Sequence, residues 1–351
     1  MNEDCLKLTT YFGERDRTAD GFVADAFTEI YARHRLQTSL VMRGVAGFGV
    51  KHHMRTDRLL TLSEDLPLVS VAVDTRARIE AARRDVDRLD FDGVVTLERA
   101  RMLTGDPGPV ELPEELHEAT KLTAYVGRQE RIGRRPAYEA IVELLHRRGI
   151  AGATVLLGVD GTAHGVRRRA AFFARNAEVP LMVISVGAGA RIAAVLPELA
   201  AMLARPLVTL ERVRVCKRDG QKLAEPSALP ETDASGLPLW QKLMVYAGEE
   251  AQYEGRPLYT AILRALREAG AAGATSLRGI WGYHGDHEPH GDSFWQLRRR
   301  VPVLTVVVDR PENARRWFEV IDALTGETGL VTAEMVPALR RATASRPQPG
   351  L

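Results

Sequence analysis

Hydrophobic positions follow two spacings along this chain, and the same succession of spacings occurs three times. Apolar residues at every second position predict short strands, as in residues 6–12, whereas apolar residues three and four positions apart predict helices, as in Tyr138, Ile141 and Leu145. In each copy the predicted order is strand, helix, strand, strand, helix, strand. A chain built from repeated units of this size must be read repeat by repeat.

Fixed spacings support the repeat. Lys7, Lys121 and Lys242 each precede the first glycine of a long loop by 37 residues, and that glycine precedes a proline by 22 or 23 residues. Every copy then ends in a similar phrase, VTLE in copies one and two and VTAE in copy three. The spacings predict repeats over residues 1–103, 119–216 and 239–341.

The segments between the repeats differ from them in composition. Residues 104–118 and 217–238 are rich in proline, glycine and acids, which is typical of linkers, and residues 342–351 are expected to form a disordered tail. At about 3.3 Å per extended residue, the shorter linker could reach roughly 40 Å. This length allows one repeat to lie beside the next.

Turn residues predict where several elements begin and end. Gly149 and Gly270 follow the first helices of copies two and three, where a left-handed residue commonly ends a helix, whereas copy one has Arg35 at this position. Pro67 and its counterparts precede apolar runs, and proline suits the first residue of a strand.

The βαββαβ order predicts an α+β fold with the ferredoxin-like layout. Two right-handed crossovers in one antiparallel sheet place both helices on one face of four strands. Leu68, Val71 and Val73 cannot all point toward the helices, because side chains alternate along a strand. The second face of each sheet therefore needs a partner, and the other copies can provide one.

Composition excludes several classes of protein. The net charge of +2 over 351 residues gives no global field for nucleic acid, so we expect no nucleic-acid partner. No apolar run reaches the roughly 20 residues that span a bilayer, and the acidic N-terminus is unlike a secretory signal. With only Cys5 and Cys216, a disulfide framework is not expected, and we predict a cytoplasmic protein.

The loop and following strand of copy one, GVAGFG…RTDRLLTLSEDLPLVSVAVDT, and the loop of copy three, RGIWGYHGDHEPHGDSF, resemble a PII-like family, the domain of unknown function numbered 190. The resemblance implies three ferredoxin-like PII-like repeats packed as a single-chain pseudo-trimer. PII-type trimers bind adenine nucleotides in clefts between subunits, beneath the loop that joins strands two and three. They also carry a glycine- and lysine-containing phosphate loop before strand four, whereas this chain has Asp90 to Gly93 there.

The long loops supply the candidate ligand-binding residues. Glycines let backbone N–H groups approach a phosphate, and lysine and arginine add charge-assisted hydrogen bonds. An alternative is that each loop is an ordinary solvated loop. The candidates are Gly44, Gly47, Gly49, Lys51, His52, His53, Arg55 and Arg58 in copy one, Gly158, Gly161, Arg167 and Arg168 in copy two, and Gly279, Gly282 and Tyr283 in copy three.

Copy three also contains a dense group of potential metal ligands. Imidazoles and carboxylates together can bind zinc or another divalent ion. The alternative is a polar loop that binds no metal and whose side chains form hydrogen bonds with one another. The candidates are His284, Asp286, His287, His290 and Asp292.

These features favour a non-enzymatic sensor that binds an adenine nucleotide or similar small anion between repeats and signals to a partner such as a membrane transporter. Because the repeats satisfy one another, we expect a monomer in solution. One alternative is a divalent-metal protein of the copper-tolerance type that uses the histidine-rich loop. Another is an enzyme acting on a phosphorylated substrate, although the sequence has no GxSxG, Walker or catalytic cysteine motif.

Overall fold

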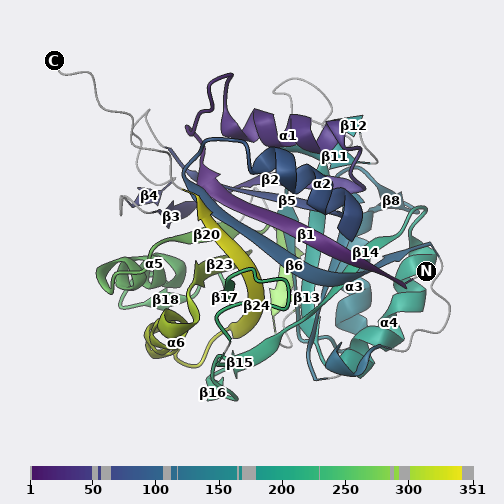
Figure 1. Ribbon diagram of the computed structural model, residues 1–351. Coiled ribbons are helices and arrows are strands. Elements are labelled where there is room, and N and C mark those ends of the chain that lie inside the picture. The colour runs from purple at the N-terminus through teal and green to yellow at the C-terminus, as the bar shows by residue number, and fades with distance from the viewer. Residues whose placement is uncertain are drawn as a thin grey trace.

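The computed structural model describes residues 2–49, 54–56, 65–105, 112–116, 118–163, 166–167, 179–228, 230–284, 288–291 and 301–341. Over these residues the protein is α+β, with six α-helices packed on an extended antiparallel sheet (Figure 1). The predicted α+β class is confirmed.

The three repeats contain the same succession of six main elements. Repeat one has β1 (Asn2–Gly13), α1 (Val23–Arg33), β2 (Thr38–Arg43), β5 (Pro67–Thr75), α2 (Arg76–Val86) and β6 (Gly93–Thr104). Repeat two has β7 (Thr120–Gly127), α3 (Ala137–Arg147), β10 (Gly152–Leu157), β13 (Pro180–Gly187), α4 (Gly189–Met202) and β14 (Leu207–Arg212). Repeat three has β17 (Leu239–Gly248), α5 (Leu258–Glu268), β20 (Ala274–Arg278), β23 (Pro302–Asp309), α6 (Pro311–Thr325) and β24 (Leu330–Arg341).

Shorter elements lie in the connections between these. The long loops contain β3 (Ala46–Phe48), β4 (Arg55–Thr56), β11 (Asp160–Ala163), β12 (Val166–Arg167), β21 (Trp281–His284) and β22 (His290–Gly291). The others are η1 (Glu114–Leu116), β8 (Arg131–Ile132), β9 (Arg135–Pro136), β15 (Arg214–Arg218), β16 (Gln221–Lys222), β18 (Gln252–Tyr253) and β19 (Arg256–Pro257). Strand β15 pairs with β24 and continues to Arg218, two residues into the expected second linker.

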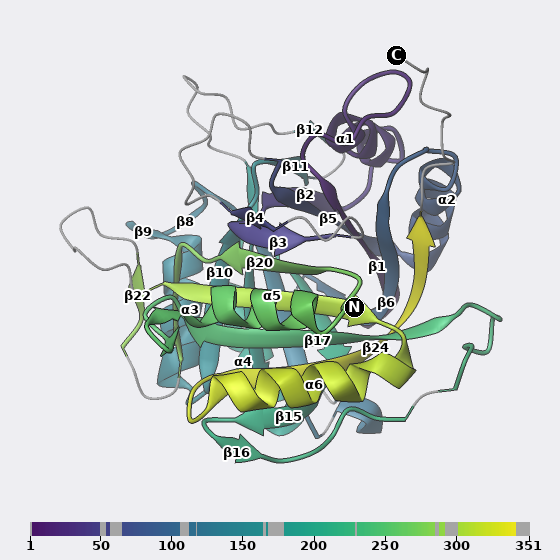
Figure 2. The ribbon, with the colours of Figure 1, turned by 90° about the vertical axis from the view of Figure 1, so that its left-hand side faces the viewer.

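Each repeat has the same strand order. In repeat one the order is β2-β5-β1-β6, with every neighbouring pair antiparallel. The corresponding orders are β10-β13-β7-β14 and β20-β23-β17-β24. Figure 2 shows α5 and α6 lying together over the sheet of repeat three.

The turn residues act as the sequence predicts. Gly149 and Gly270, just beyond α3 and α5, have φ values of 68° and 93°. Arg35 adopts the same left-handed region, with φ of 49°, although it carries a side chain. Strand β5 begins at Pro67, and its two counterparts also begin at proline.

The loop strands join the repeats in a cycle. Strand β3 of repeat one pairs with β20 of repeat three, β11 of repeat two pairs with β2 of repeat one, and β21 of repeat three pairs with β10 of repeat two. A second cycle is formed by the fourth strands together with β15, which directly follows β14. In this cycle β6 pairs with β14, β15 pairs with β24, and β24 pairs with β6. Each repeat therefore shares backbone hydrogen bonds with both of the others.

Four major hydrophobic clusters follow from this arrangement. Each repeat has one between its helices and its sheet, and a fourth contains residues of all three repeats. Leu68 lies in the helix-side cluster of repeat one, whereas Val71 and Val73 lie in the shared one. The second faces of the sheets therefore cover one another, as the alternation of apolar residues predicts.

A closed ring of six buried charges joins the repeats at their centre. Lys7, Lys121 and Lys242 alternate with Glu98, Glu211 and Glu334, and their side chains are between 1% and 8% exposed. Within a repeat, each lysine lies directly across two paired strands from its own glutamate. Each lysine also reaches the glutamate of a second repeat. The six nitrogen–oxygen distances are Lys7–Glu98 2.7 Å, Lys7–Glu211 2.9 Å, Lys121–Glu211 2.9 Å, Lys121–Glu334 2.6 Å, Lys242–Glu334 2.8 Å and Lys242–Glu98 2.9 Å.

Opposite charges outweigh burial at four members of the ring, whereas the pKa of Lys121 is lowered because burial outweighs Glu211 and Glu334. Burial alone would lower the pKa of Lys7, but the carboxylates of Glu211 and Glu98 outweigh it and hold that pKa well above its ordinary value. Burial would raise the pKa of Glu98, but Lys242 and Lys7 hold it well below its ordinary value. The pKa of Glu334 is also lowered, because Lys121 and Lys242 outweigh burial.

We predict that Glu98→Gln lowers the free energy of unfolding by about 3–5 kcal/mol, because Lys7 and Lys242 lose a charged partner in a dry site. Glu211→Gln and Glu334→Gln should have similar effects, measured by urea unfolding. Glu14→Gln, which alters a half-exposed pair with Arg43, is the matched control and should cost at most about 1 kcal/mol. A loss no larger than that of the control at any of the three ring positions would contradict the cyclic arrangement.

The ring also predicts how stability varies with pH. The lowered pKa values of Glu98 and Glu334 mean that the unfolded chain takes up protons before the folded one. Stability should therefore begin to fall as pH drops below the unfolded glutamate pKa of about 4.3, and the loss should continue down to the folded pKa values. Unfolding curves of Glu98→Gln should depend less on pH in this range than those of the unaltered protein.

Candidate functional site

The long loop of each repeat leaves the sheet through one repeated hydrogen-bond pattern. In repeat one, the N–H of Gly44 donates to the carbonyl of Pro67 at 2.8 Å, and the N–H of Val45 donates to Ser276 of repeat three at 2.9 Å. Gly158 and Gly279 likewise donate to the prolines that end their loops, and the next residue donates to the neighbouring repeat. The base of every loop is thus attached to two repeats at once.

The second glycine of each loop lies against the backbone of a neighbouring repeat. A Cβ on Gly47 would lie 2.7 Å from the carbonyl oxygen of Ala274, and one on Gly161 would overlap the carbonyl oxygen of Ser39. A Cβ on Gly282 would overlap the carbonyl oxygen of Ala153. The structure therefore gives these three glycines a role in pairing strands between repeats, whereas Gly49 has no neighbour that a Cβ would meet within 4 Å.

Most of the predicted cationic residues fall outside the described part of the chain. Lys51, His52, His53, Arg58 and Arg168 lie there. For two more, only the backbone is described, Arg55 in β4 and Arg167 in β12. Their binding of an anion stays a prediction.

Tyr283, predicted from the sequence as a ligand-binding residue, is instead buried between repeats. It is 2% exposed, its hydroxyl donates to the carbonyl of Ile150 at 2.7 Å, and its ring packs edge-on against His146 with ring centroids 4.8 Å apart. Burial raises the pKa of this hydroxyl. The side chain fastens the loop of repeat three to repeat two.

Two of the predicted metal ligands are described. His284 Nε2 lies 3.3 Å from Glu250 Oε1, and this hydrogen bond raises the pKa of His284 and lowers that of Glu250. His290 Nδ1 lies 2.7 Å from the carbonyl of Glu288. Asp286, His287 and Asp292 lie outside the described residues. Within the described ranges, the one group of three ligand-type side chains within 4.8 Å is Glu98, Glu211 and Glu334, which the ring lysines already neutralise.

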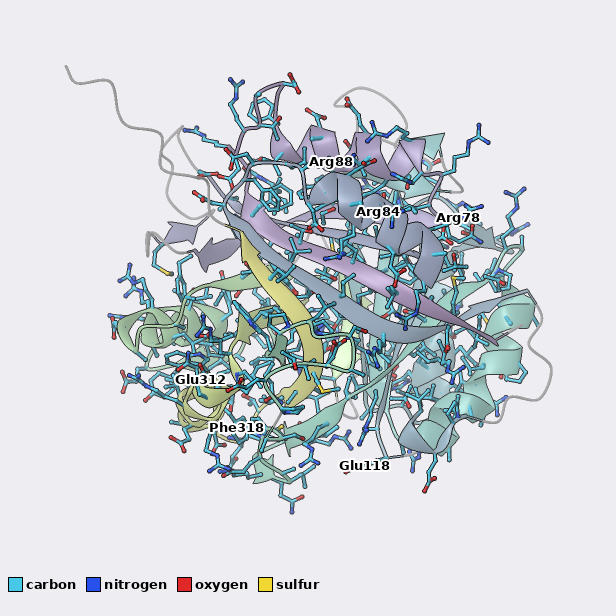
Figure 3. The ribbon with its side chains drawn as sticks, viewed as in Figure 1. Arg78, Arg84, Arg88, Glu118, Glu312 and Phe318 are labelled. Carbon is cyan, nitrogen blue, oxygen red and sulfur yellow. The ribbon has the colours of Figure 1, made fainter. Side chains whose placement is uncertain are left out.

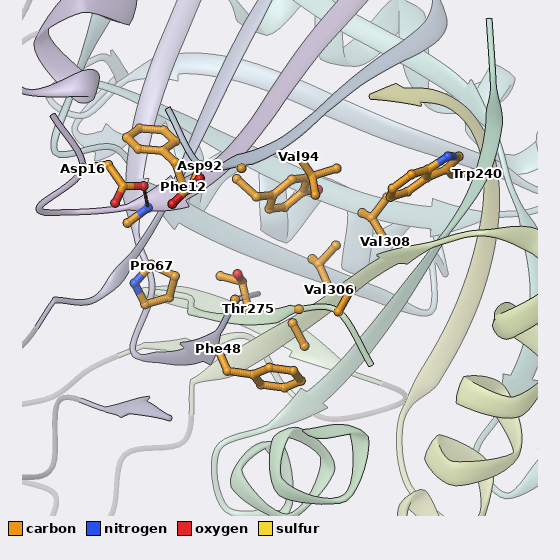
Figure 4. Close-up of a pocket in the computed structure, with 17 residues that line it drawn as sticks. Phe12, Asp16, Phe48, Pro67, Asp92, Val94, Trp240, Thr275, Val306 and Val308 are labelled. Atoms are coloured by element: carbon orange, nitrogen blue, oxygen red, sulfur yellow. Dashed lines mark hydrogen bonds between the residues drawn. The ribbon is translucent and has the colours of Figure 1, made fainter. Parts of the chain in front are cut away.

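A cavity of about 120 Å³ lies between repeats one and three, under the start of the first long loop (Figure 4). Repeat one contributes the end of β1, the tip of β3 and the turn before β6. Repeat three contributes β17, β23 and the start of β20. The lining residues are Tyr11, Phe12, Gly13, Asp16, Phe48, Gly49, Pro67, Asp92, Gly93, Val94, Trp240, Ala272, Gly273, Ala274, Thr275, Val306 and Val308.

The cavity has an acidic end and an apolar end. Asp16 and Asp92 lie at one end near Phe12 and Pro67, whereas Trp240 and Val308 lie at the other (Figure 4). Asp16 accepts a hydrogen bond of 2.7 Å from the N–H of Gly13, which fixes the turn after β1. None of the described lining residues is lysine or arginine.

One residue of the cavity wall also interacts electrostatically with the ring of charges. Tyr11 lines the cavity, and its hydroxyl lies in the field of Lys242 and Glu98. Burial raises its pKa further than Lys242 lowers it, so this tyrosine stays neutral.

The counterparts of Tyr11 and Val94 differ in burial between the other two clefts. Between repeats two and three, Tyr246 and Leu330, which correspond to Tyr11 and Val94, pack in a cluster with Ala119 and Val186. Between repeats one and two, Tyr125 and Leu207 are each 5% exposed in the shared central cluster. Tyr246 and Leu330 are half-buried, as Tyr11 and Val94 are, so burial distinguishes the cleft between repeats one and two.

Sequence reasoning found the loop but not the rest of the site. Tyr11, Trp240 and Val94 come from strands that read as ordinary sheet residues, and only their places in the repeat bring them together. The repeated lysine and glutamate positions were a usable signal for the ring, because a charge inside an apolar strand pattern is unusual.

Comparison with known proteins matches the repeats one by one. The model of the DUF190 family, described as an uncharacterized ACR, matches residues 5–102, 119–215 and 240–338. The UPF0166 protein of Aquifex aeolicus is 33% identical over 97 residues, which are 28% of this chain and 90% of that protein. The UPF0166 protein of Methanocaldococcus jannaschii is 32% identical over 89 residues, which are 25% of this chain and 82% of that protein. Each relative thus corresponds to one repeat.

Among solved structures, an aspartate kinase from Synechocystis aligns with 96% of this chain at 10% identity. This chain covers 52% of that enzyme, and the TM-score is 0.24, which is too low to support any argument about fold or activity. In the described part of the chain, no helix is long and apolar enough to cross a membrane.

The inter-repeat glycines give a direct test of the loop geometry. We predict that Gly47→Ala destabilises the protein by about 1–3 kcal/mol, because the added methyl group must push β3 away from β20. Gly49→Ala, two residues later in open space, is the matched control and should change stability by less than about 0.5 kcal/mol. Urea unfolding measures both, and equal losses would show that β3 is not held against repeat three.

Proposed function

This chain belongs to the DUF190 family of uncharacterized proteins, and on that premise we propose that it is a PII-like sensor of a small ligand. In this proposal the three repeats are ferredoxin-like units that form a single-chain pseudo-trimer. The ligand, an adenine nucleotide or a similar small anion, binds in a cleft between repeats.

The two cycles of strand pairing support the pseudo-trimer. Each repeat pairs with both neighbours through equivalent strands, and the ring of charges closes only when all three repeats are present. Helix α2 lies on the outside, as the exposed Arg78 and Arg84 on this helix and Arg88 just after it illustrate (Figure 3). A chain built in this way has no unpaired repeat to offer to a second chain.

The observation that carries the proposal is the cavity between repeats one and three. Its wall includes Phe48 and Gly49 from the first long loop, so a bound ligand would contact that loop directly. Along the sequence, Gly49 is followed two positions later by Lys51, the first of the cationic residues predicted to bind the ligand. Binding would thereby bias the loop and pass the signal to a partner, for which we propose a membrane transporter.

The proposal also specifies one site per chain. In this proposal Leu207 and Leu330, which are bulkier than Val94, narrow the other two clefts, and Tyr125 and Leu207 are buried in one of them. These two clefts would then serve to hold the repeats together, while the first cleft binds.

Isothermal titration of metal-stripped protein with AMP, ADP and ATP tests this assignment. We expect saturable binding of at least one nucleotide with one site per chain, weakened in a Lys51→Ala, Arg58→Ala variant. The matched control, Arg78→Ala and Arg84→Ala on exposed α2, should bind normally. Three equal sites would contradict the specialised cleft. Heat evolved only on adding zinc, and lost in a His284→Ala, His290→Ala variant, would favour the metal-binding alternative instead.

The same proposal predicts a monomer. Light scattering should give a mass near 38.7 kDa for the full chain at micromolar concentration. A stable trimer of chains would mean that sheet faces or edges remain unsatisfied within one chain, and it would overturn the pseudo-trimer.

A further inference from the structure

The helical layers of the three repeats differ in charge, although they are built from equivalent elements. The basic layer is that of repeat two, residues 127–149 and 188–206, which include β8, β9, α3 and α4. We propose that the basic layer is a docking surface for an anionic lipid bilayer. This inference goes beyond the proposed function, because it concerns a surface that does not line the cavity.

Counts of arginine, aspartate and glutamate show the difference in charge. The basic layer contains eight arginines and four glutamates, which give a net charge of +4. The equivalent residues of repeat one, 13–35 and 75–93, contain nine arginines and ten acids, which give −1. Those of repeat three, 248–270 and 310–329, contain six arginines and eight acids, which give −2. A net positive charge is therefore a property of one of three equivalent surfaces.

All eight arginines of the basic layer are exposed, and its acids neutralise few of them. Glu143 pairs with Arg135, and Glu198 pairs with Arg147 and Arg148. Among the described residues, no carboxylate forms an ion pair with the other five arginines of the layer, which are Arg128, Arg131, Arg134, Arg191 and Arg205.

These five arginines lie at both ends of the basic layer. Arg191 donates to the carbonyl of Gly149 at 2.7 Å, so the start of α4 lies against the end of α3. The β8–β9 hairpin precedes α3 at its other end. There, burial raises the pKa of Tyr138 while Arg128 and Arg131 both act against this rise, so both cations lie near its hydroxyl. Cations spread in this way suit a broad anionic surface rather than a single small anion.

The basic layer lacks the large apolar anchors on which protein interfaces depend. Apart from Arg191, the exposed residues of α4 are Ala190, Ala194 and Ala201. None of the large exposed hydrophobic residues in the described part of the chain belongs to the layer. Protein interfaces take most of their binding energy from buried aromatic and other large side chains. An anionic bilayer needs cations near its surface, and each one strengthens binding by about fivefold.

Docking through the basic layer would leave the cavity between repeats one and three open. In Figure 1, α3 and α4 lie toward the right of the molecule, whereas β3 and β20, which contribute to the cavity wall, lie toward the left. The two surfaces can therefore be tested separately.

Co-sedimentation of the full chain with lipid vesicles tests the proposal. The vesicles contain phosphatidylcholine alone, or phosphatidylcholine and phosphatidylglycerol in equal parts. We expect the protein to sediment with the anionic vesicles and not with the neutral ones. It should be released at about 1 M salt, where the Debye length falls to about 3 Å. Absence of binding to the anionic vesicles at low salt would overturn the proposal.

A triple variant of the hairpin locates the binding. Changing Arg128, Arg131 and Arg134 to Gln removes three exposed cations that have no carboxylate partner among the described residues. Binding to the anionic vesicles should weaken by about tenfold or more. Thermal unfolding shows whether the variant is folded.

The matched control removes as many exposed arginines from repeat three. Changing Arg256, Arg264 and Arg316 to Gln alters the net charge of the chain by the same amount. Vesicle binding should change by less than about twofold, because these side chains belong to a layer of net negative charge that is separate from the docking surface. Equal losses in the two triple variants would mean that overall charge governs binding, which would contradict the proposal.

A further outcome would identify another partner. If the full chain binds duplex DNA in a salt-dependent manner but not the anionic vesicles, the basic layer is a nucleic-acid surface and the lipid proposal fails. Either failure leaves the sensor proposal standing, since nucleotide titration measures the cleft and not this layer.

Discussion

The structure depends on the closed ring of three lysines and three glutamates at its centre. A buried ion costs several kcal/mol unless its partners are close and complete. Here each lysine needs one glutamate from its own repeat and one from another, so removing any repeat leaves two charges short of a partner. The ring therefore stabilises one arrangement of the three repeats and penalises arrangements with a repeat missing or out of place.

The ring also fixes register within each repeat. Lys7 lies directly opposite Glu98, and slipping β1 by one residue would turn its lysine away from the axis and its apolar side chains to the wrong face. The inter-repeat glycines act in the same direction from the periphery, since Gly47, Gly161 and Gly282 let the loop strands approach neighbouring backbones. Central charges and peripheral backbone pairing specify the same cyclic order.

The three clefts differ in their side chains, although the repeats share the same elements and strand order. Because the chain encodes each repeat separately, side chains at one cleft can change without changing the others, which a trimer of identical subunits cannot do. Val94 has leucine counterparts, and Phe48 has counterparts bonded into neighbouring repeats. The cavity between the first and third repeats is therefore lined by residues that the other two clefts do not repeat.

Much of the fold could be predicted from local signals. The strand-leading prolines and the left-handed glycines after α3 and α5 lie where the spacing indicated, because their backbone preferences are set locally. The cavity could not be predicted, since Tyr11 and Trp240 come from different repeats and look like sheet residues in sequence. Tyr283 shows the opposite error, because its place in a glycine-rich loop predicted a ligand-binding residue, whereas its side chain anchors the loop to repeat two.

A double-mutant cycle across Lys7 and Glu211, which belong to different repeats, tests the central role of the ring most directly. The free energies of unfolding of Lys7→Met, Glu211→Met and the double variant would be measured in urea. If the ring holds the repeats together, each single variant will be strongly destabilised, because it leaves one buried charge in excess. The double variant removes one lysine and one glutamate, so the remaining four charges balance, and its loss should be about 2 kcal/mol or more below the sum of the two single losses. Additive losses, with no coupling between the two residues, would show that the ring does not hold the repeats together.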